Sequence, residues 1–221
     1  FEIGTEEQSG STNTAEELDY TLSKMLTFCE KNKMSKPFFV VIQTGTKVME
    51  LRNVGSLESS IRIENELPPE IQIPMMIDIC NKYGVYLKQH NTDYLSSETL
   101  KWHPKLGVHA ANVAPEYGVA ETLAFLDVLE TNKLHSLSEQ FLNLSLKSKK
   151  WDKWMIEDTL ASDRQRSIIA GHYVFSTEQF KSIKKEASEV LLKKDINIDD
   201  FLKNRIKQSI LRYLKNFRLI K

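Results

Sequence analysis

The chain has 221 residues, of which 41% are hydrophobic and 27% are charged, and its 30 basic and 30 acidic residues cancel to a formal net charge of zero. This composition is typical of a soluble globular protein with enough apolar residues for a core. No apolar run approaches the roughly 20 residues of a membrane-spanning helix, and the first residues show no signal-peptide pattern. Cys29 and Cys80 lie far apart on predicted helices, so we expect buried thiols, a reducing compartment and a cytoplasmic location.

The charge is unevenly spread along the chain. The segment from Lys181 to Lys221 has 12 basic and 5 acidic residues, a clear positive surplus. A basic helical tail is one signature of nucleic-acid binding. Because neither stacking aromatic residues nor an RNA-binding motif accompanies these charges, we interpret the segment as a solvated helix face. We expect no nucleic-acid or membrane partner.

Strands and helices alternate through the first 132 residues. The first strand ends at Ile3, and Thr14 with Glu17 forms a capping box that begins a helix. The apolar run Phe38–Ile42 predicts a strand buried on both faces, as in parallel sheets. The remaining predicted elements are a helix that starts at the proline pair 68–69 and ends at Gly84, a strand at 85–87, a short helix at 96–102, a strand at 106–108 and a helix after Pro115.

This order predicts parallel β/α units, because helices separate successive strands. Polar side chains follow every predicted strand, as on the catalytic face of a barrel. We therefore predict an α/β fold of the (β/α)8 TIM-barrel type, in which residues 1–132 supply about four β/α units and residues 133–221 form a helical extension. A doubly wound open sheet also fits the alternation, but no GxGxxG or Walker motif supports it.

The chain opens with Phe1 inside an apolar stretch, which we interpret as a sign that it is a piece of a longer protein. Half a barrel exposes two unpaired strand edges. We therefore expect these edges to need a missing half or a second copy of the chain.

Two histidines follow neighbouring predicted strands. His90 lies in the segment Gln89-His90-Asn91-Thr92-Asp93-Tyr94 after the third strand, and His109 follows the fourth. A neutral imidazole binds divalent metals, and a carboxylate such as Asp93 orients it or carries a proton. A lone histidine is usually structural, but adjacent strands lie about 4.8 Å apart, so their ends meet at one edge. We predict that His90 and His109 share a metal site.

Acidic residues follow the first predicted strand. Strand alternation puts Glu2 on the same face as Gly4, so we expect Glu2 to point into the barrel mouth as a third metal ligand. Glu6, like Asp93, is a candidate for proton transfer. The alternative for both glutamates is an acidic loop on a negatively charged body.

Amides and one lysine complete the candidate site. Gly45 lets a ligand approach the backbone, and Lys47 is suited to phosphate or carboxylate, although a solvated lysine is the commoner case. The predicted substrate-binding residues are Gln43, Lys47, Asn91, Thr92 and Asn112. A further cluster, Asp163–Arg166 with His172, is a second candidate for anion binding, and a surface helix explains it equally well. Serine hydrolases, zincins and zinc fingers lack support, because no GxSxG, HExxH or CxxC pair is present.

Taken in order, these loops resemble the GatZ/KbaZ-like family, the subunits associated with class II D-tagatose-1,6-bisphosphate aldolase. The matching stretches are Gly4–Glu6, the strand through Gln43, His90–Tyr94, the strand through His109 and the region near Asp163-Arg164. The resemblance covers most of the chain and is most specific at His90–Tyr94, where the family pattern is roughly H-S-T-D-Y-Q. It implies that Phe1 begins at the fifth strand of an eight-stranded barrel.

The resemblance implies sugar chemistry. True class II aldolases coordinate zinc through histidines, one of them where His90 falls, but Thr46-Lys47-Val48 stands where another is expected. GatZ/KbaZ proteins share that loss and are regarded as non-catalytic partners of the aldolase, whereas some relatives resemble metal-dependent ketose or ketonate 4-epimerases. This chain departs from the family where His109–Asn112 replaces a phosphate loop, which disfavours bisphosphate binding and adds a candidate ligand.

We therefore predict metal-dependent retro-aldol or epimerase chemistry on a ketose or ketose phosphate. A divalent metal, with zinc as the expected ion, is held by His90, His109 and Glu2 in this hypothesis. The alternative is a non-catalytic subunit that stabilises a class II aldolase. The expected partners are accordingly a sugar or sugar phosphate and either an aldolase subunit or further copies of the chain.

Overall fold

The structure is a computed structural model that describes residues 1–4 and 13–221. The chain folds into two compact units. The first comprises Phe1–Val48, Arg52–Val113 and Lys215–Lys221, and the second comprises Met49–Leu51 and Ala114–Leu214. Among the described residues, no helix has both the length and the apolar character needed to span a membrane.

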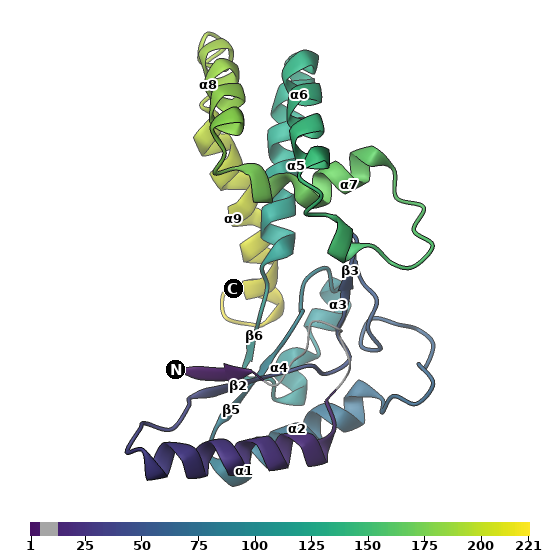
Figure 1. The fold of residues 1–221 in the computed structure, drawn as a ribbon, viewed down its shortest axis with the longest axis vertical. Coiled ribbons are helices and arrows are strands. Elements are labelled where there is room, and N and C mark those ends of the chain that lie inside the picture. Colours follow the sequence, from purple (N-terminus) through teal and green to yellow (C-terminus); the bar gives the residue numbers. More distant parts are fainter. Residues whose placement is uncertain (5–12) are drawn as a thin grey trace. The chain divides into compact units, whose positions relative to one another are not determined.

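The first unit is built on a four-stranded parallel sheet with the order β1-β2-β5-β6 (Figure 1). Its strands are β1 (Glu2–Gly4), β2 (Phe39–Ile42), β5 (Tyr86–Gln89) and β6 (Ala110–Ala111). The register pairs Ile42 with Gln89, and Gln89 with Ala111, so these residues lie at the same level at the carboxyl ends of their strands. The predicted α/β class with parallel strands is confirmed, and the described strands form an open sheet.

Two long helices cover one face of this sheet (Figure 1). The first is α1 (Ala15–Lys31), whose predicted capping box between Thr14 and Glu17 is present. The second is α2 (Pro69–Tyr83), which Gly84 ends in the left-handed conformation at φ 61°, as predicted. Their buried side chains and those of the strands form one core: Leu18, Leu22, Val40, Ile42, Met76, Cys80, Val85 and Leu87.

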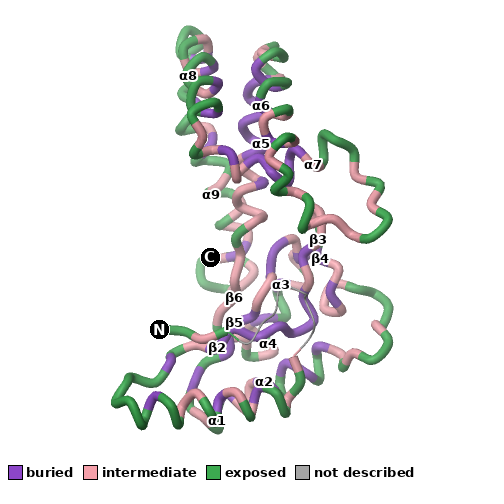
Figure 2. Tube along the Cα trace, in the orientation of Figure 1, coloured by how far each residue is buried: buried purple, intermediate pink, exposed green. Residues whose placement is uncertain are grey.

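Burial in this core explains why the strands are rich in apolar residues. Figure 2 shows the tube coloured by burial, with the buried stretches of the chain in purple. Val40, Ile42 and Leu87 are fully buried in this core. Removing each such side chain from water stabilises the fold by roughly 1.5–3 kcal/mol. Both cysteines are buried free thiols, as predicted, and burial raises the pKa of the Cys80 thiol to about 12.

The segment before β6 differs from the prediction of a strand at 106–108. It forms two short helices, α3 (Ser97–Leu100) and α4 (His103–Leu106). Pro104 has the fixed φ that suits the first turn of a helix, and Gly107 then ends α4 at φ 83°. His109 consequently precedes the last strand, whereas the sequence analysis expected it to follow that strand.

The long connection between β2 and α2 contains a two-stranded sheet of β3 (Val48–Met49) and β4 (Arg52–Asn53). On either side of it in the chain, Gly45 and Gly55 allow two backbone segments to touch. A side chain at Gly55 would collide with the carbonyl oxygen of Gly45, and Gly45 itself has φ 69°. The loop after β2 is therefore held in a fixed fold by a contact between two backbones.

The second unit is helical. Its helices are α5 (Pro115–Thr131), α6 (His135–Lys147), η1 (Asp152–Trp154), α7 (Asp163–Ala170), η2 (Gly171–Val174), α8 (Glu178–Leu192) and α9 (Ile198–Asn216). The rings of Phe125, Phe141 and Phe180 lie 5.0–5.6 Å apart at the centre of its core. Because the apolar side of α5 packs in this core, the two units divide after Val113, earlier than the boundary expected at residue 132.

Candidate functional site

Buried polar side chains gather where β2 and β5 end. Gln43, Thr44 and Gln89 each have an exposed fraction of 0%, although they directly follow or close apolar strands. Buried polar groups are stable only when they are hydrogen-bonded. Their bonds form what we call the strand-end network, composed of Gln43, Thr44, Thr46, Gln89 and His90.

His90 is the histidine of this network, and its ring is half-buried. Its Nδ1 lies 2.9 Å from Oε1 of Gln43, which also accepts a hydrogen bond of 3.3 Å from the Asn91 amide. The Thr46 hydroxyl donates to the backbone carbonyl of His90 at 2.6 Å. The loop after β2 therefore holds both the backbone and the ring of His90.

A second branch of the network runs through Gln89. Its Nε2 donates to the carbonyl and to the hydroxyl oxygen of Thr44, at 3.0 and 2.8 Å, so its Oε1 faces Nε2 of His103 as an acceptor. His103 is 3% exposed, and burial lowers the pKa of its imidazole from 6.5 to about 4. The ring is therefore neutral, and its Nε2–H donates to Gln89.

Asn53 fixes the loop that carries His90. Its amide nitrogen donates to the carbonyls of Asn91 and Asp93 at 2.8 and 2.9 Å. Its amide oxygen accepts from the N–H groups of Lys47 and Gly55 at 3.1 and 3.2 Å. One buried side chain thus joins the loop after β2 to the loop after β5.

The loop after β5 has an unusual backbone. Asn91 and Tyr94 both have positive φ, at 51° and 61°, a region that few residues other than glycine adopt. Thr92 and Asp93 are 0% and 2% exposed, and the Thr92 N–H donates to the carbonyl of Asn112 at 3.0 Å. The surrounding hydrogen bonds hold this backbone in place, so the predicted residues Asn91, Thr92, Asp93 and Asn112 lie around one loop.

The two predicted metal histidines lie at opposite ends of β5. Register pairs Lys88 with Ala110, which puts His109 level with Leu87, whereas His90 follows Gln89. At about 3.3 Å per residue, the two positions are separated by roughly 10 Å along the strand. Nδ1 of His109 accepts the Leu87 N–H at 3.3 Å, and burial lowers the pKa of this imidazole. The structure does not bring His109 to the strand-end network, because the last strand begins after it.

The acidic residues are also dispersed. Glu2 lies on β1, and its carboxylate is 2.9 Å from Nζ of Lys88 in a half-exposed ion pair. Glu6 lies outside the described residues. Within residues 1–4 and 13–221, no group of three histidine, cysteine, aspartate or glutamate side chains is positioned to hold a metal ion. The predicted set of His90, His109 and Glu2 therefore does not surround one ion.

Sequence analysis missed Asn53 and His103. Asn53 is in a turn-rich segment, and His103 lies next to a predicted short helix, so neither stands out by position. The Asn53 amide nitrogen bonds carbonyls 38 and 40 residues away, and His103 bonds Gln89, 14 residues away. An asparagine or histidine that bonds distant backbone or amide groups leaves no local pattern in the sequence.

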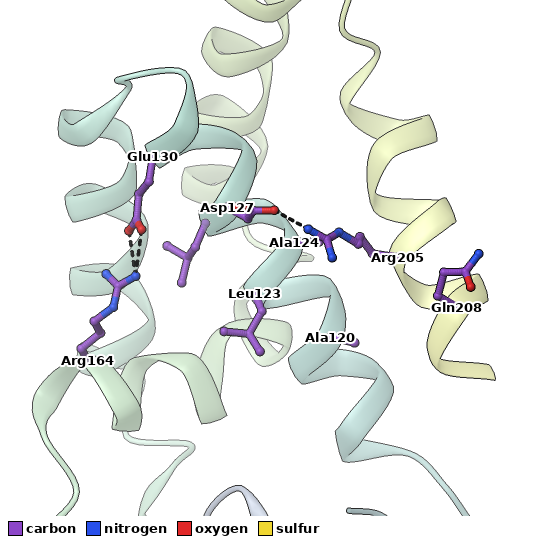
Figure 3. Close-up of a pocket in the computed structure, with 9 residues that line it drawn as sticks. Ala120, Leu123, Ala124, Asp127, Glu130, Arg164, Arg205 and Gln208 are labelled. Atoms are coloured by element: carbon purple, nitrogen blue, oxygen red, sulfur yellow. Dashed lines mark hydrogen bonds and ion pairs between the residues drawn. The ribbon is translucent and has the colours of Figure 1, made fainter. Parts of the chain in front are cut away.

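The helical unit has a groove of about 540 Å³ over α5, α7 and α9, and Figure 3 shows its side chains. Arg164 bonds both carboxylate oxygens of Glu130, at 2.8 and 3.0 Å, and Arg205 lies 2.5 Å from Asp127. Leu123, 45% exposed, also lines the groove. Both arginines of the groove are already paired with carboxylates, which weakens their attraction for a further anion. The pairing of Arg164 therefore disfavours the anion site that the sequence suggested around it.

Comparison with known proteins gives a fold. No protein-family model matches the chain, and no curated protein matches it. Among solved structures it is similar to the glycerol complex of fructuronate-tagaturonate epimerase UxaE from Cohnella laeviribosi, with a TM-score of 0.66 and 13% identity over 98% of this chain and 45% of that one. It is also similar to a probable tagatose 6 phosphate kinase from Sinorhizobium meliloti 1021, with a TM-score of 0.68 and 15% identity over 97% and 62% of the two chains.

These similarities define the class of fold. The chain shares an α/β architecture with both proteins over almost its full length. It spans about half the length of the epimerase, whose native structure matches it over the same share, with a TM-score of 0.61. At 12–15% identity the likeness is one of fold.

Proposed function

We propose that the chain contributes part of the active site of a sugar-converting enzyme that acts on a ketose, ketonate or ketose phosphate. The observation that carries this proposal is the strand-end network, which holds His90 and Asn91 at the carboxyl ends of parallel strands. Ligands of α/β folds bind at this end. The fold shared with a fructuronate-tagaturonate epimerase and a probable tagatose 6 phosphate kinase supports a sugar ligand.

The proposal includes a closed (β/α)8 barrel of the GatZ/KbaZ type. Four consecutive parallel strands with intervening helices are half of such a barrel. Within the described residues, β1 and β6 each have one neighbouring strand, and thus one unpaired edge. Four more β/α units would pair both edges, which agrees with the 45% share of the epimerase that this chain spans.

The site suits a ligand rich in hydroxyl groups. Amide side chains such as those of the half-buried Asn91 and Asn112 offer both donors and acceptors, and a neutral imidazole takes up a proton near pH 7. We assign His90 as the group that removes the proton of a substrate hydroxyl, with Asp93 as a second proton carrier. Lys47 is the residue that we assign to an anionic group of the substrate.

This chemistry matches retro-aldol epimerisation. As the base takes the hydroxyl proton, a C=O bond forms at that carbon and the adjacent C–C bond breaks. The electron pair moves onto the ketose fragment as an enolate. Re-addition to the other face of the new carbonyl inverts the carbon, and the proton returns to its oxygen.

A divalent metal such as zinc stabilises an enolate, but the predicted ligand set does not fit one ion. His109 lies at the other end of β5, and the Glu2 carboxylate is bound to Lys88. An ion at His90 needs ligands other than these two residues. We therefore assign the proton transfer to residues of the chain.

The test compares His90→Ala with His109→Ala in turnover of ketonates and ketose phosphates, followed by proton NMR with and without added Zn²⁺. We expect His90→Ala to lower kcat/KM at least about 100-fold, because positioned proton transfer contributes roughly 10²–10⁴-fold. His109→Ala should change it less than about threefold. Equal losses in both variants would contradict the assignment of His90 as the proton-transfer group. No turnover, together with co-purification of an aldolase subunit, would favour the alternative of a non-catalytic stabilising subunit.

A further inference from the structure

The orientation of the Gln43 amide is determined by its neighbour Thr46. The Thr46 hydroxyl has one hydrogen, and it donates that hydrogen to the carbonyl of His90, which can only accept. Toward Gln43, 3.5 Å away, the same hydroxyl oxygen must therefore accept. The Gln43 group that faces Thr46 is consequently its NH2, and its oxygen faces His90.

This orientation determines which nitrogen of His90 carries the proton. The Gln43 oxygen accepts from Asn91 at 3.3 Å and lies 2.9 Å from Nδ1 of His90. An amide oxygen offers no hydrogen, so Nδ1 must donate. In a neutral ring the lone pair is then on Nε2.

We propose that Gln43 and Thr46 are positioning residues that hold His90 in the Nδ1–H tautomer and so place the lone pair of its neutral ring on Nε2. Free histidine favours the opposite tautomer, with the proton on Nε2. The network reverses that preference with a partner that is 0% exposed and uncharged. Because Gln43 is an amide, it orients the ring without the carboxylate charge that would favour the imidazolium.

The consequence for catalysis rests on the proposed function, but the tautomer does not. Nε2 is the nitrogen farther from the backbone, and in the neutral Nδ1–H tautomer it carries the lone pair of the ring. A histidine with its proton on Nε2 would offer a donor there instead. Which role His90 Nε2 takes therefore depends on Gln43, which contacts Nδ1, and on Thr46, which orients the Gln43 amide.

The experiment is long-range ¹⁵N–¹H NMR of the full chain labelled at its 5 histidines, recorded above pH 8. The His90→Ala spectrum identifies the His90 signals. We expect Nδ1 of His90 to show the shift of a protonated nitrogen, and Gln43→Met to move the major population to the Nε2–H form. Thr46→Val should shift the ratio in the same direction, whereas Thr46→Ser, which keeps the hydroxyl, should restore it.

Gln89→Met is the matched control. Gln89 is the same residue type, is also 0% exposed and ends the neighbouring strand, but it bonds Thr44 and His103. It should lower the melting temperature about as much as Gln43→Met and leave the His90 tautomer unchanged. Circular dichroism of each variant shows that the fold is kept.

Two results overturn the inference: a wild-type His90 with its proton on Nε2, or a tautomer ratio that Gln43→Met and Gln89→Met change equally. The proposed function fails differently. An Nδ1–H tautomer without turnover of any ketose or ketonate leaves the inference standing and removes the function. If turnover occurs, Gln43→Met should lower kcat about tenfold or more with little change in KM, as expected when a proton-transfer group is misaligned.

Discussion

The two ends of the same parallel strands are built from different chemistry. At the carboxyl end, Gln43 and Gln89 are completely buried, and the oxygen and nitrogen of each side-chain amide are hydrogen-bonded. At the amino end, Phe38 and Tyr86 are 59% and 43% exposed, and their rings pack edge to face at 4.9 Å. One end is an ordered polar layer, and the other is an aromatic cluster open to solvent.

Each end has a histidine, and the two use the same nitrogen in opposite ways. Nδ1 of His90 donates to the Gln43 oxygen, whereas Nδ1 of His109 accepts the Leu87 N–H. The His109 ring also packs 4.8 Å from the Tyr86 ring. His109 thus replaces a carbonyl that β6 is too short to supply. Both histidines lie beside β5, yet their Nδ1 atoms have opposite hydrogen-bonding roles because their partners differ.

The largest expected effect is at the carboxyl end, in Asn53→Ala. This change leaves two carbonyls and two N–H groups without their buried partner, and each such group costs roughly 1–3 kcal/mol. Water and small backbone shifts would provide new partners for some of these four groups. We therefore expect the free energy of unfolding to fall by about 4 kcal/mol. Urea unfolding followed by circular dichroism measures the loss.

Asn81→Ala is the control for Asn53, because Asn81 is exposed on α2. Exposed helix substitutions usually change stability by less than about 0.5 kcal/mol. If both variants lose the same small amount, the loop after β5 does not depend on Asn53, and the contrast between the two ends is weaker than proposed.

A smaller loss of stability is expected when the pH is lowered, because His103 is buried as a neutral ring. The pKa of His103 is about 4 in the fold and 6.5 in its ordinary state, so the unfolded chain binds a proton between these values that the folded chain does not. The stability contribution is complete above pH 6.5 and is lost as the pH falls toward 4, by about 3 kcal/mol in total. Urea unfolding of wild type and His103→Gln at pH 7 and pH 4.5 measures how much of the pH dependence of stability comes from His103. A pH dependence that is the same in both proteins would show that His103 is not its source.

The smallest effect is expected at the amino end, in His109→Ala. It removes one hydrogen bond to a backbone N–H and one ring contact, so we expect a loss of about 1 kcal/mol or less. Burial lowers the pKa of His109, so this contribution is present at neutral pH and weakens as acid protonates Nδ1. Thermal unfolding at pH 8 and pH 5 measures it, and a loss as large as that of Asn53→Ala would contradict the comparison.

Local sequence rules predicted much of the scaffold. The capping box at Thr14, the apolar strand β2 and the αL end of α2 at Gly84 depend on residues within a few positions of one another. The strand β6 did not follow such rules, because it has two residues and its position depends on pairing with β5. That error moved His109 from one end of the sheet to the other.

Local sequence patterns also explain why only part of the site was predicted. His90, Asn91 and Gln43 follow strands that local patterns identify, and the structure brings them together. Asn53 joins the loop after β5 from 38 and 40 residues away, and His103 bonds Gln89 from 14 residues away, separations over which hydrophobic period and turn signals carry no information. Only the folded chain shows that they hold the loops on which the predicted residues lie.

The contact between Gly45 and Gly55 has a consequence for engineering. Since a methyl group at Gly55 would overlap the backbone of the other segment, no side chain at that position can be used to vary the loop after β2. Lys47 and Val54 lie just inside this pinned pair and are only partly buried. A mutagenesis library that seeks a new ligand preference should therefore vary positions 47 and 54 and keep both glycines. The contact between the two glycines would then preserve the backbone of the loop while its side chains change.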